Sequence, residues 1–165
     1  MAKAQDAIRI AEGALREQLT RLLRGGQAHA RFEEVARGIP PGDRGRRPRG
    51  LPHSAWELLE HLRIAQWDIL EFSRDPAHVS PSFPDGYWPA TAAPPSAAAW
   101  TRSRRQFQAD LAAMVALVTK GDLWTPFPHG NGQTLLREAL LLADHNAYHL
   151  GQLVLLRRLL GNWNA

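Results

Sequence analysis

The final segment of the chain, residues 134–160, constrains the fold most strongly, because its apolar residues cover nearly the whole circumference of a helix. They are Leu135, Leu136, Leu140, Leu141, Leu142, Leu150, Leu153, Val154, Leu155, Leu156, Leu159 and Leu160. A helix that is apolar on all sides is buried on several of them. This segment therefore needs other helices around it, which predicts a helical bundle.

Three earlier segments, near residues 4–24, 54–73 and 96–120, also carry apolar residues at helical spacing, and glycine and proline separate them. Ser54 opens the second of them and forms a capping box with Glu57, and Ser96 is the expected cap of the third. Together with the final segment they predict an all-α protein, a four-helix bundle with long, partly irregular connections, in a single domain over residues 1–165.

The connections between these helices are rich in turn-forming residues. We expect a shorter helix within residues 27–39 and a small hairpin at Asn131-Gly132. Residues 74–95 contain six prolines, too many for regular structure, and a loop of this length is more often functional than idle. The loop contains the aromatic residues Phe83, Tyr87 and Trp88, and Trp100 lies at the start of the next helix. These rings either cover the mouth of a pocket or cap the end of the core.

The chain contains no cysteine, which excludes disulfide bonds, cysteine-ligated zinc and a protein thiol nucleophile. No apolar run approaches the roughly 18–20 residues of a membrane-spanning helix. The N-terminal segment carries charged residues too closely spaced for a signal peptide. These features predict a soluble, cytoplasmic protein with no membrane partner.

The net charge is +4, and part of the positive charge lies in the loop of residues 42–50, at Arg44, Arg46, Arg47 and Arg49. A basic loop can bind phosphates or nucleic acid. No aromatic residue is interleaved with these arginines, and no recognition helix accompanies them. A solvated connector is therefore the favoured interpretation, and we predict no specific nucleic-acid partner.

Two histidines, His145 and His149, lie four residues apart in the final segment. On a helix this spacing places both imidazoles on one side, and the apolar surroundings place them inside the bundle. A third histidine, His61, lies on the apolar side of the second long helix. Imidazole is the commonest protein ligand for zinc, nickel and iron, so the three could form a metal site if their helices face one another. Three imidazoles leave coordination positions open, as in catalytic metal sites.

A structural role for these histidines stays open, because buried imidazoles are often simply hydrogen-bonded within a core. Asn146 stands where the metalloprotease motif HExxH has its glutamate, so that chemistry is not indicated. The remaining histidines lie in or beside predicted loops and are expected at the surface: His29, His53, His78 and His129. Of these, His53 and His129 are also candidates for the rim of a pocket.

A metal-bound imidazole usually donates its second N–H to a carboxylate or carbonyl. Glu57 and Asp68, on the helix of His61, are candidate acceptors, and so is Gln152, which follows His149 by three residues. Asp144 is less suitable, because adjacent residues point about 100° apart around a helix. Each of these side chains is also open to the commoner interpretation as an ordinary surface or interhelical polar residue.

The segments SAWELLEHLRIAQWD and TLLREALLLADHNAYHLGQLVLLRRLLG resemble the DinB-like family, a four-helix-bundle superfamily of metal-dependent enzymes. In that family one histidine of the second helix and a His-x-x-x-His pair of the last helix bind a divalent metal. His61, His145 and His149 match these positions in order. The Gly-Gln that commonly follows the pair is present at Gly151 and Gln152, whereas Leu150 stands where many members carry arginine.

The resemblance implies one divalent metal ion, such as Zn, Ni or Fe, held by His61, His145 and His149. Relatives of this kind include bacillithiol transferases and a mycothiol-dependent maleylpyruvate isomerase. It therefore implies a transferase-like or hydrolase-like enzyme that activates a low-molecular-weight thiol or water, with a small-molecule substrate. Dimeric relatives also imply a homodimer. The alternative is a non-catalytic metal-binding bundle that acts as a stress-response or scaffold protein.

Overall fold

The computed structural model describes residues 2–163, and within that range the regular structure is entirely helical. The all-α prediction is therefore confirmed, and the long helices begin and end within one or two residues of their predicted limits. The α-helices are α1 (Ala2–Arg24), α2 (Phe32–Ala36), α3 (Ala55–Arg74), α4 (Ala97–Lys120) and α5 (Leu135–Leu159). Two short 3₁₀ turns are η1 (Pro41–Asp43) and η2 (Asp85–Tyr87).

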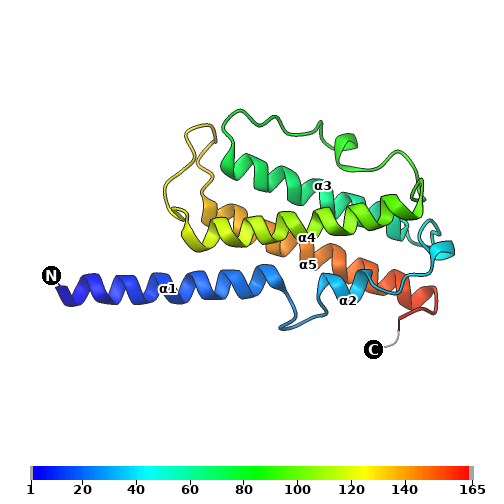
Figure 1. Cartoon of the computed structure of the whole chain (residues 1–165), viewed down its shortest axis with the longest axis horizontal. Helices are drawn as coiled ribbons and strands as arrows, with labels where there is room; N and C mark the ends of the chain where they lie inside the picture. Colours follow the sequence, from blue (N-terminus) through cyan, green and yellow to red (C-terminus); the bar gives the residue numbers. More distant parts are fainter. Residues whose placement is uncertain (1, 164–165) are drawn as a thin grey trace.

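The four long helices form a bundle in which α3 and α4 run in the same direction and α5 runs against both (Figure 1). Trp56 and Trp100, near the starts of α3 and α4, have ring centroids 6.4 Å apart. One turn-rich segment, residues 75–95, joins the end of α3 to the start of α4. Because these helices are parallel, this connection has to run back along the length of α3, as Figure 1 shows.

Side-chain caps fix where the long helices begin. The Ser54 hydroxyl accepts a hydrogen bond from the backbone N–H of Glu57, and the Glu57 carboxylate accepts one from Ser54 N–H, which completes the predicted capping box. Ser96 and Thr134 accept in the same way from the third residue of α4 and of α5. These caps satisfy backbone donors that have no partner within their own helix.

Two hydrophobic clusters fill the bundle. One joins α2 to the first half of α3 and the second half of α5, with Phe32, Leu59 and Leu153 buried in it. The other joins the end of α1 to α4 and to the start of α5. A buried polar pair connects α3, α4 and α5: Asn146 Nδ2 donates to Gln66 Oε1 at 3.0 Å, and Gln66 Nε2 donates to the Phe107 carbonyl at 2.6 Å.

The prediction that α5 is buried on nearly all sides is only partly right. One stripe of the helix is exposed, formed by Leu141, Tyr148, Leu155 and Leu159. The stripe lies on the side of α5 opposite Ala139, Asn146 and Leu150, which are buried against the rest of the bundle. The N-terminal half of α1 projects beyond the other helices (Figure 1). Ile8 and Ile10 on that half are each 67% exposed.

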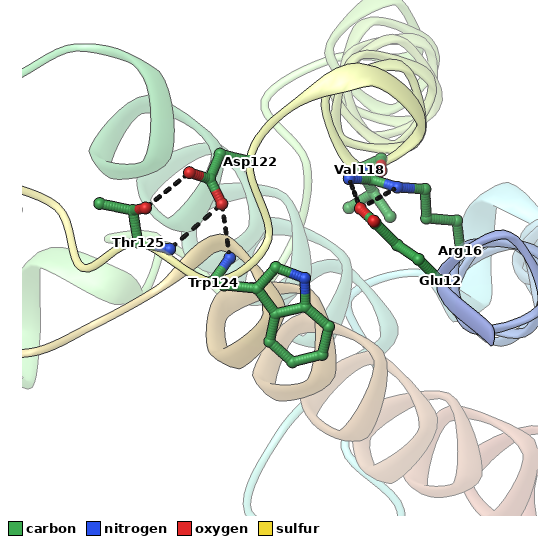
Figure 2. Close-up of polar contacts among 6 residues, drawn as sticks. All are labelled: Glu12, Arg16, Val118, Asp122, Trp124 and Thr125. Carbon is green, nitrogen blue, oxygen red and sulfur yellow. Dashed lines mark hydrogen bonds and ion pairs between the residues drawn. The ribbon is translucent and has the colours of Figure 1, made fainter. Parts of the chain in front are cut away.

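Polar contacts fasten the second half of α1 to the end of α4 (Figure 2). The Arg16 guanidinium donates to the Val118 carbonyl at 2.6 Å and pairs with Glu12. Beyond α4, the Asp122 carboxylate accepts hydrogen bonds from the backbone N–H groups of Trp124 and Thr125 and from the Thr125 hydroxyl. The turn after α4 is thereby closed by one side chain.

The predicted hairpin at Asn131-Gly132 is not a β-hairpin, because residues 2–163 contain no strand. The chain does reverse there, and the Phe127 N–H donates to the Gln133 carbonyl at 2.8 Å. Gly132 has φ +92°, a conformation that side-chain-bearing residues rarely adopt. The glycine therefore permits a tight loop rather than a strand pair.

The arginine-rich loop is fastened to the bundle by its own side chains. Arg47 pairs with Glu57 at the start of α3, and the Arg44 guanidinium lies 4.8 Å from the centroid of the Trp100 ring. Arg46 pairs with Asp43 at 2.7 Å. These contacts support the interpretation of the loop as a connector. Among the described residues, no helix is both long enough and apolar enough to cross a membrane.

Candidate metal centre

The three predicted histidines meet between α3 and α5. Nε2 of His61 lies 3.1 Å from Nε2 of His145 and 3.1 Å from Nε2 of His149. One ring nitrogen of each histidine lies within 4.8 Å of the others. The i,i+4 spacing on α5 presents two imidazoles to the one on α3, and the cluster could hold a metal ion.

Two of the three nitrogen separations, those from His61 to His145 and to His149, match those of ligands around a single ion. Two nitrogens bound at about 2.0–2.1 Å lie roughly 3.4 Å apart at a tetrahedral angle and about 2.9 Å apart at a right angle. The observed 3.1 Å falls between these values. These two distances are therefore compatible with either angle, and the nitrogens of the third pair, His145 and His149, lie within 4.8 Å of each other.

The hydrogen bonds on the far side of two rings fix where their protons lie. Nδ1 of His61 is 3.0 Å from the Tyr87 carbonyl, and Nδ1 of His149 is 2.9 Å from Oε1 of Gln152. Both oxygens are acceptors, so each Nδ1 carries the proton and each Nε2 presents a lone pair. Two lone pairs then face each other across 3.1 Å with no proton between them. A cation between them would turn this repulsion into coordination.

Burial keeps all three imidazoles neutral. Burial lowers the pKa of His61 and of His149 below the ordinary histidine value. Burial, and then the proximity of His149 and His61, lowers the pKa of His145 to about 4. At neutral pH no extra proton is therefore available to bridge the facing nitrogens, and the three rings are in the form that binds metals.

His145 differs from the other two histidines because its Nδ1 is buried without a hydrogen-bond partner among the described residues. Ligand histidines usually donate this N–H to a neighbouring acceptor. The adjacent Asn146 donates Nδ2 to Gln66 in the core, and its Oδ1 is also buried without a hydrogen bond among the described residues. The orientation of the His145 ring therefore depends on packing and on whatever its Nε2 binds.

The loop between α3 and α4 lies against the site. The Trp88 ring stacks on His61, with centroids 4.0 Å apart and planes 5° apart, and it also stacks on His53 at 4.0 Å. Tyr87 contributes its carbonyl to His61. Phe83 is 88% exposed and Trp100 is buried in the core. The four aromatic residues are thus divided between the site, the solvent and the core.

The predicted hydrogen-bond partners of the histidines are correct in one case out of three. Gln152 bonds His149 as expected. Glu57 is instead engaged by Arg47 and by the capping box of α3. Asp68 does not reach His61. Its carboxylate accepts hydrogen bonds from the Tyr87 hydroxyl at 2.6 Å and from Nε2 of His78 at 2.8 Å.

The predicted surface positions of the four other histidines are only partly correct. His78 is not a surface residue, because its side chain is only 8% exposed and is held by Asp68. His129 bonds the Phe72 carbonyl near the end of α3, well away from His61 along that helix. His53 stacks on Trp88 beside the site, whereas His29 is exposed. The contact of His78 with Asp68 was not predictable from the sequence, because it depends on the path of an irregular loop, whereas Trp88 was one of the aromatic residues expected to cover a pocket or cap the core.

A hollow of about 180 Å³ lies next to the histidines and is lined by Leu51, Pro52, His53, Leu58, Gln152 and Leu155. Two of these residues also belong to the surroundings of the site: Gln152 bonds His149, and His53 stacks on Trp88. No acidic or permanently charged side chain lines the hollow. It suits a small neutral group, since a cavity of about 150 Å³ accepts benzene.

Comparison with known protein families matches residues 25–153 to the DinB superfamily. The match includes all three histidines and the loop that covers them. No curated protein and no solved structure matches the chain.

Proposed function

Because this chain belongs to the DinB superfamily and brings three neutral imidazoles together, we propose that it is a metal-dependent enzyme that activates a small thiol or water. In this proposal His61, His145 and His149 bind one divalent ion. The observation that carries it is the pair of Nε2 lone pairs that face each other at 3.1 Å. Such an arrangement is unfavourable without a cation and favourable with one.

A divalent ion held by the three imidazoles would act as a Lewis acid and would lower the pKa of a thiol or water in an open coordination position. The residues of this chain have simpler roles. Tyr87 and Gln152 orient two of the imidazoles, and Trp88 covers one face of His61. Zn, Ni and Fe(II) all accept imidazole ligands, so the proposal includes each of them.

We propose a low-molecular-weight thiol as cosubstrate, because the chain contains no cysteine of its own to supply sulfur. Such thiols are kept reduced in the cytoplasm, which is the location we propose. The reaction would be transferase-like if the thiolate attacks an electrophilic substrate and hydrolase-like if water attacks. The hollow beside Gln152 would accept an apolar part of either reactant.

The competing function is a metal-binding bundle without turnover, acting as a scaffold or in a stress response. The neighbouring hollow favours the enzyme, because a purely structural metal site is usually closed by four protein ligands and has no adjacent cavity.

The experiment that separates the two functions is a turnover screen on protein loaded with Zn, Ni or Fe(II). Low-molecular-weight thiols would be paired with electrophilic acceptors, and hydrolysis substrates would be tested in parallel. The enzyme proposal expects turnover that requires the metal and is lost in His149→Ala. Stoichiometric metal binding without turnover in any pairing would favour the scaffold alternative.

A further inference from the structure

Asp68 is a largely buried carboxylate that makes no contact with the metal site itself. It lies on α3 seven residues beyond His61, about two helical turns away. Its side chain is 12% exposed. Both of its oxygens are used: Oδ2 accepts from the Tyr87 hydroxyl at 2.6 Å, and Oδ1 accepts from Nε2 of His78 at 2.8 Å. Both donors belong to the loop between α3 and α4.

Tyr87 is held at two points that lie about two turns apart on α3. Its side chain reaches Asp68, and its backbone carbonyl accepts from Nδ1 of His61 at 3.0 Å. Asp68 and His61 are therefore connected through a single residue. The next residue, Trp88, stacks on the His61 ring, so the same stretch of chain covers and orients this imidazole.

The loop has little structure of its own to keep Tyr87 in place. Residues 75–95 contain six prolines and only the short turn η2, with local backbone bonds around Pro84 and Asp85. An irregular segment of this kind is positioned by its contacts with the rest of the protein. The hydrogen bonds that end on Asp68 are such contacts, and the adjacent His78 also packs edge-on against the Trp67 ring on α3.

We infer that Asp68 is a positioning residue for His61 and acts through Tyr87. By holding the Tyr87 hydroxyl, Asp68 keeps the Tyr87 carbonyl opposite Nδ1 of His61, and this keeps the proton on Nδ1 and the lone pair on Nε2. The inference rests on the proposed function in one respect, since the lone pair is useful only if a metal binds there.

Loss of the Asp68–Tyr87 bond should leave the His61 ring in place but weaken control over its proton. The tautomer with the proton on Nε2 then becomes accessible, and that tautomer cannot coordinate a metal. Partners of ligand histidines are typically worth about 10–100-fold in metal affinity. We expect a loss in this range when the bond is removed.

The test compares Tyr87→Phe with the matched control Tyr148→Phe. Both variants lose one phenolic hydroxyl and keep the ring, but Tyr148 is 65% exposed beside His149 and is not part of the connection to Asp68. Two quantities are measured for each protein: the dissociation constant for Co²⁺, and the tautomer of His61 in the metal-free protein by ¹⁵N NMR. A melting temperature establishes that each variant is folded.

The expected result is an affinity loss of about 10-fold or more in Tyr87→Phe, with a mixed His61 tautomer, and wild-type behaviour in Tyr148→Phe. Wild-type affinity and a pure Nδ1–H tautomer in a folded Tyr87→Phe variant would overturn the inference. If the wild type binds no Co²⁺, the proposed function fails, and the metal-free tautomer alone still decides whether Asp68 positions His61.

A second comparison uses Asp68→Ala with Asp144→Ala as its control, because Asp144 is an exposed carboxylate next to His145. Asp68→Ala should change the His61 tautomer as Tyr87→Phe does, whereas Asp144→Ala should not. In the double variant Asp68→Ala/Tyr87→Phe the affinity loss should be smaller than the product of the single losses, because both act through one connection. Independent, fully multiplying losses would contradict that connection.

Discussion

At the scale of single residues, His145 is the ligand candidate with the least support from the protein. His61 and His149 donate Nδ1–H to a carbonyl and an amide oxygen, whereas Nδ1 of His145 is buried without a partner among the described residues. A buried polar atom without a hydrogen bond reduces stability. The metal-free protein therefore keeps this imidazole at a cost that metal binding would offset.

The stability of the metal-free protein should consequently depend on pH through His145. Burial lowers its pKa to about 4 in the folded protein, against 6.5 for the ordinary side chain. Between these values the unfolded chain binds a proton that the folded chain does not, so the free energy of unfolding should fall as pH falls from about 6.5 toward 4. Urea unfolding of the wild type and of His145→Leu would measure this. The variant should lose less stability over that interval, and parallel curves would contradict the assignment.

His145 and His149 could be predicted as a pair because helical spacing places both on one side of a helix. His61 could be predicted because it lies on the apolar side of another helix and matches the pattern of the DinB-like family. The residues that orient them could not be predicted as readily. Tyr87 acts through its backbone carbonyl, which is the same in every residue type and leaves no mark in the sequence. The burial of His78 also depends on where an irregular loop crosses α3.

At the scale of elements, the residue that caps α3 also holds the loop that covers the site. Ser54 is fully buried, its hydroxyl accepts from Glu57 N–H, and the same hydroxyl donates to the Ala92 carbonyl near the end of the loop. One side chain thus starts α3 and holds the returning chain beside it.

Ser54→Ala should therefore cost more stability than Ser96→Ala. Ser96 is an exposed cap whose hydroxyl accepts from Ala99 N–H, so its loss should cost about 1 kcal/mol. Ser54→Ala loses a buried cap and also leaves the part-buried Ala92 carbonyl without its donor, so about 2–3 kcal/mol is expected. Urea denaturation of the two variants tests this order, and equal losses would indicate that the Ala92 contact contributes nothing.

The limits of the helices were predictable because caps and breaks are local signals, as at Ser54 and Gly25. The exposed stripe of α5 was not predictable in the same way. Leucines such as Leu141, Leu155 and Leu159 are typical of a core, but they lie on the side of α5 that is turned away from its buried face. Which faces of a helix are buried is decided by the neighbouring elements.

At the scale of the whole molecule, the parallel arrangement of α3 and α4 explains why the site has a cover. A connection between parallel helices must return along the bundle, as this one does (Figure 1). On its way it places the Trp88 ring against His61. The long proline-rich loop is thus a requirement of the topology that also supplies Tyr87 and Trp88 to the site.

The exposed stripe of α5 and the projecting half of α1 lead us to propose a homodimer. Both surfaces carry large apolar side chains, such as Leu141, Tyr148 and Ile8, in positions that a second copy could cover by two-fold symmetry. Light scattering should give a mass near twice 18.4 kDa, and Leu141→Glu/Tyr148→Glu should lower it toward one chain. A wild-type mass of one chain at high micromolar concentration would contradict the proposal.

The central claim is that His61, His145 and His149 bind one divalent ion together, and equilibrium metal binding to matched variants tests it most directly. The wild type and His29→Ala, whose imidazole is exposed, should bind one Co²⁺ or Zn²⁺ per chain with equal affinity. Each of His61→Ala, His145→Ala and His149→Ala should bind at least about 100-fold more weakly, because even residues that only support a ligand are worth about 10–100-fold. Unchanged affinity in any one of the three, or a reconstituted wild type that binds no ion, would contradict the claim.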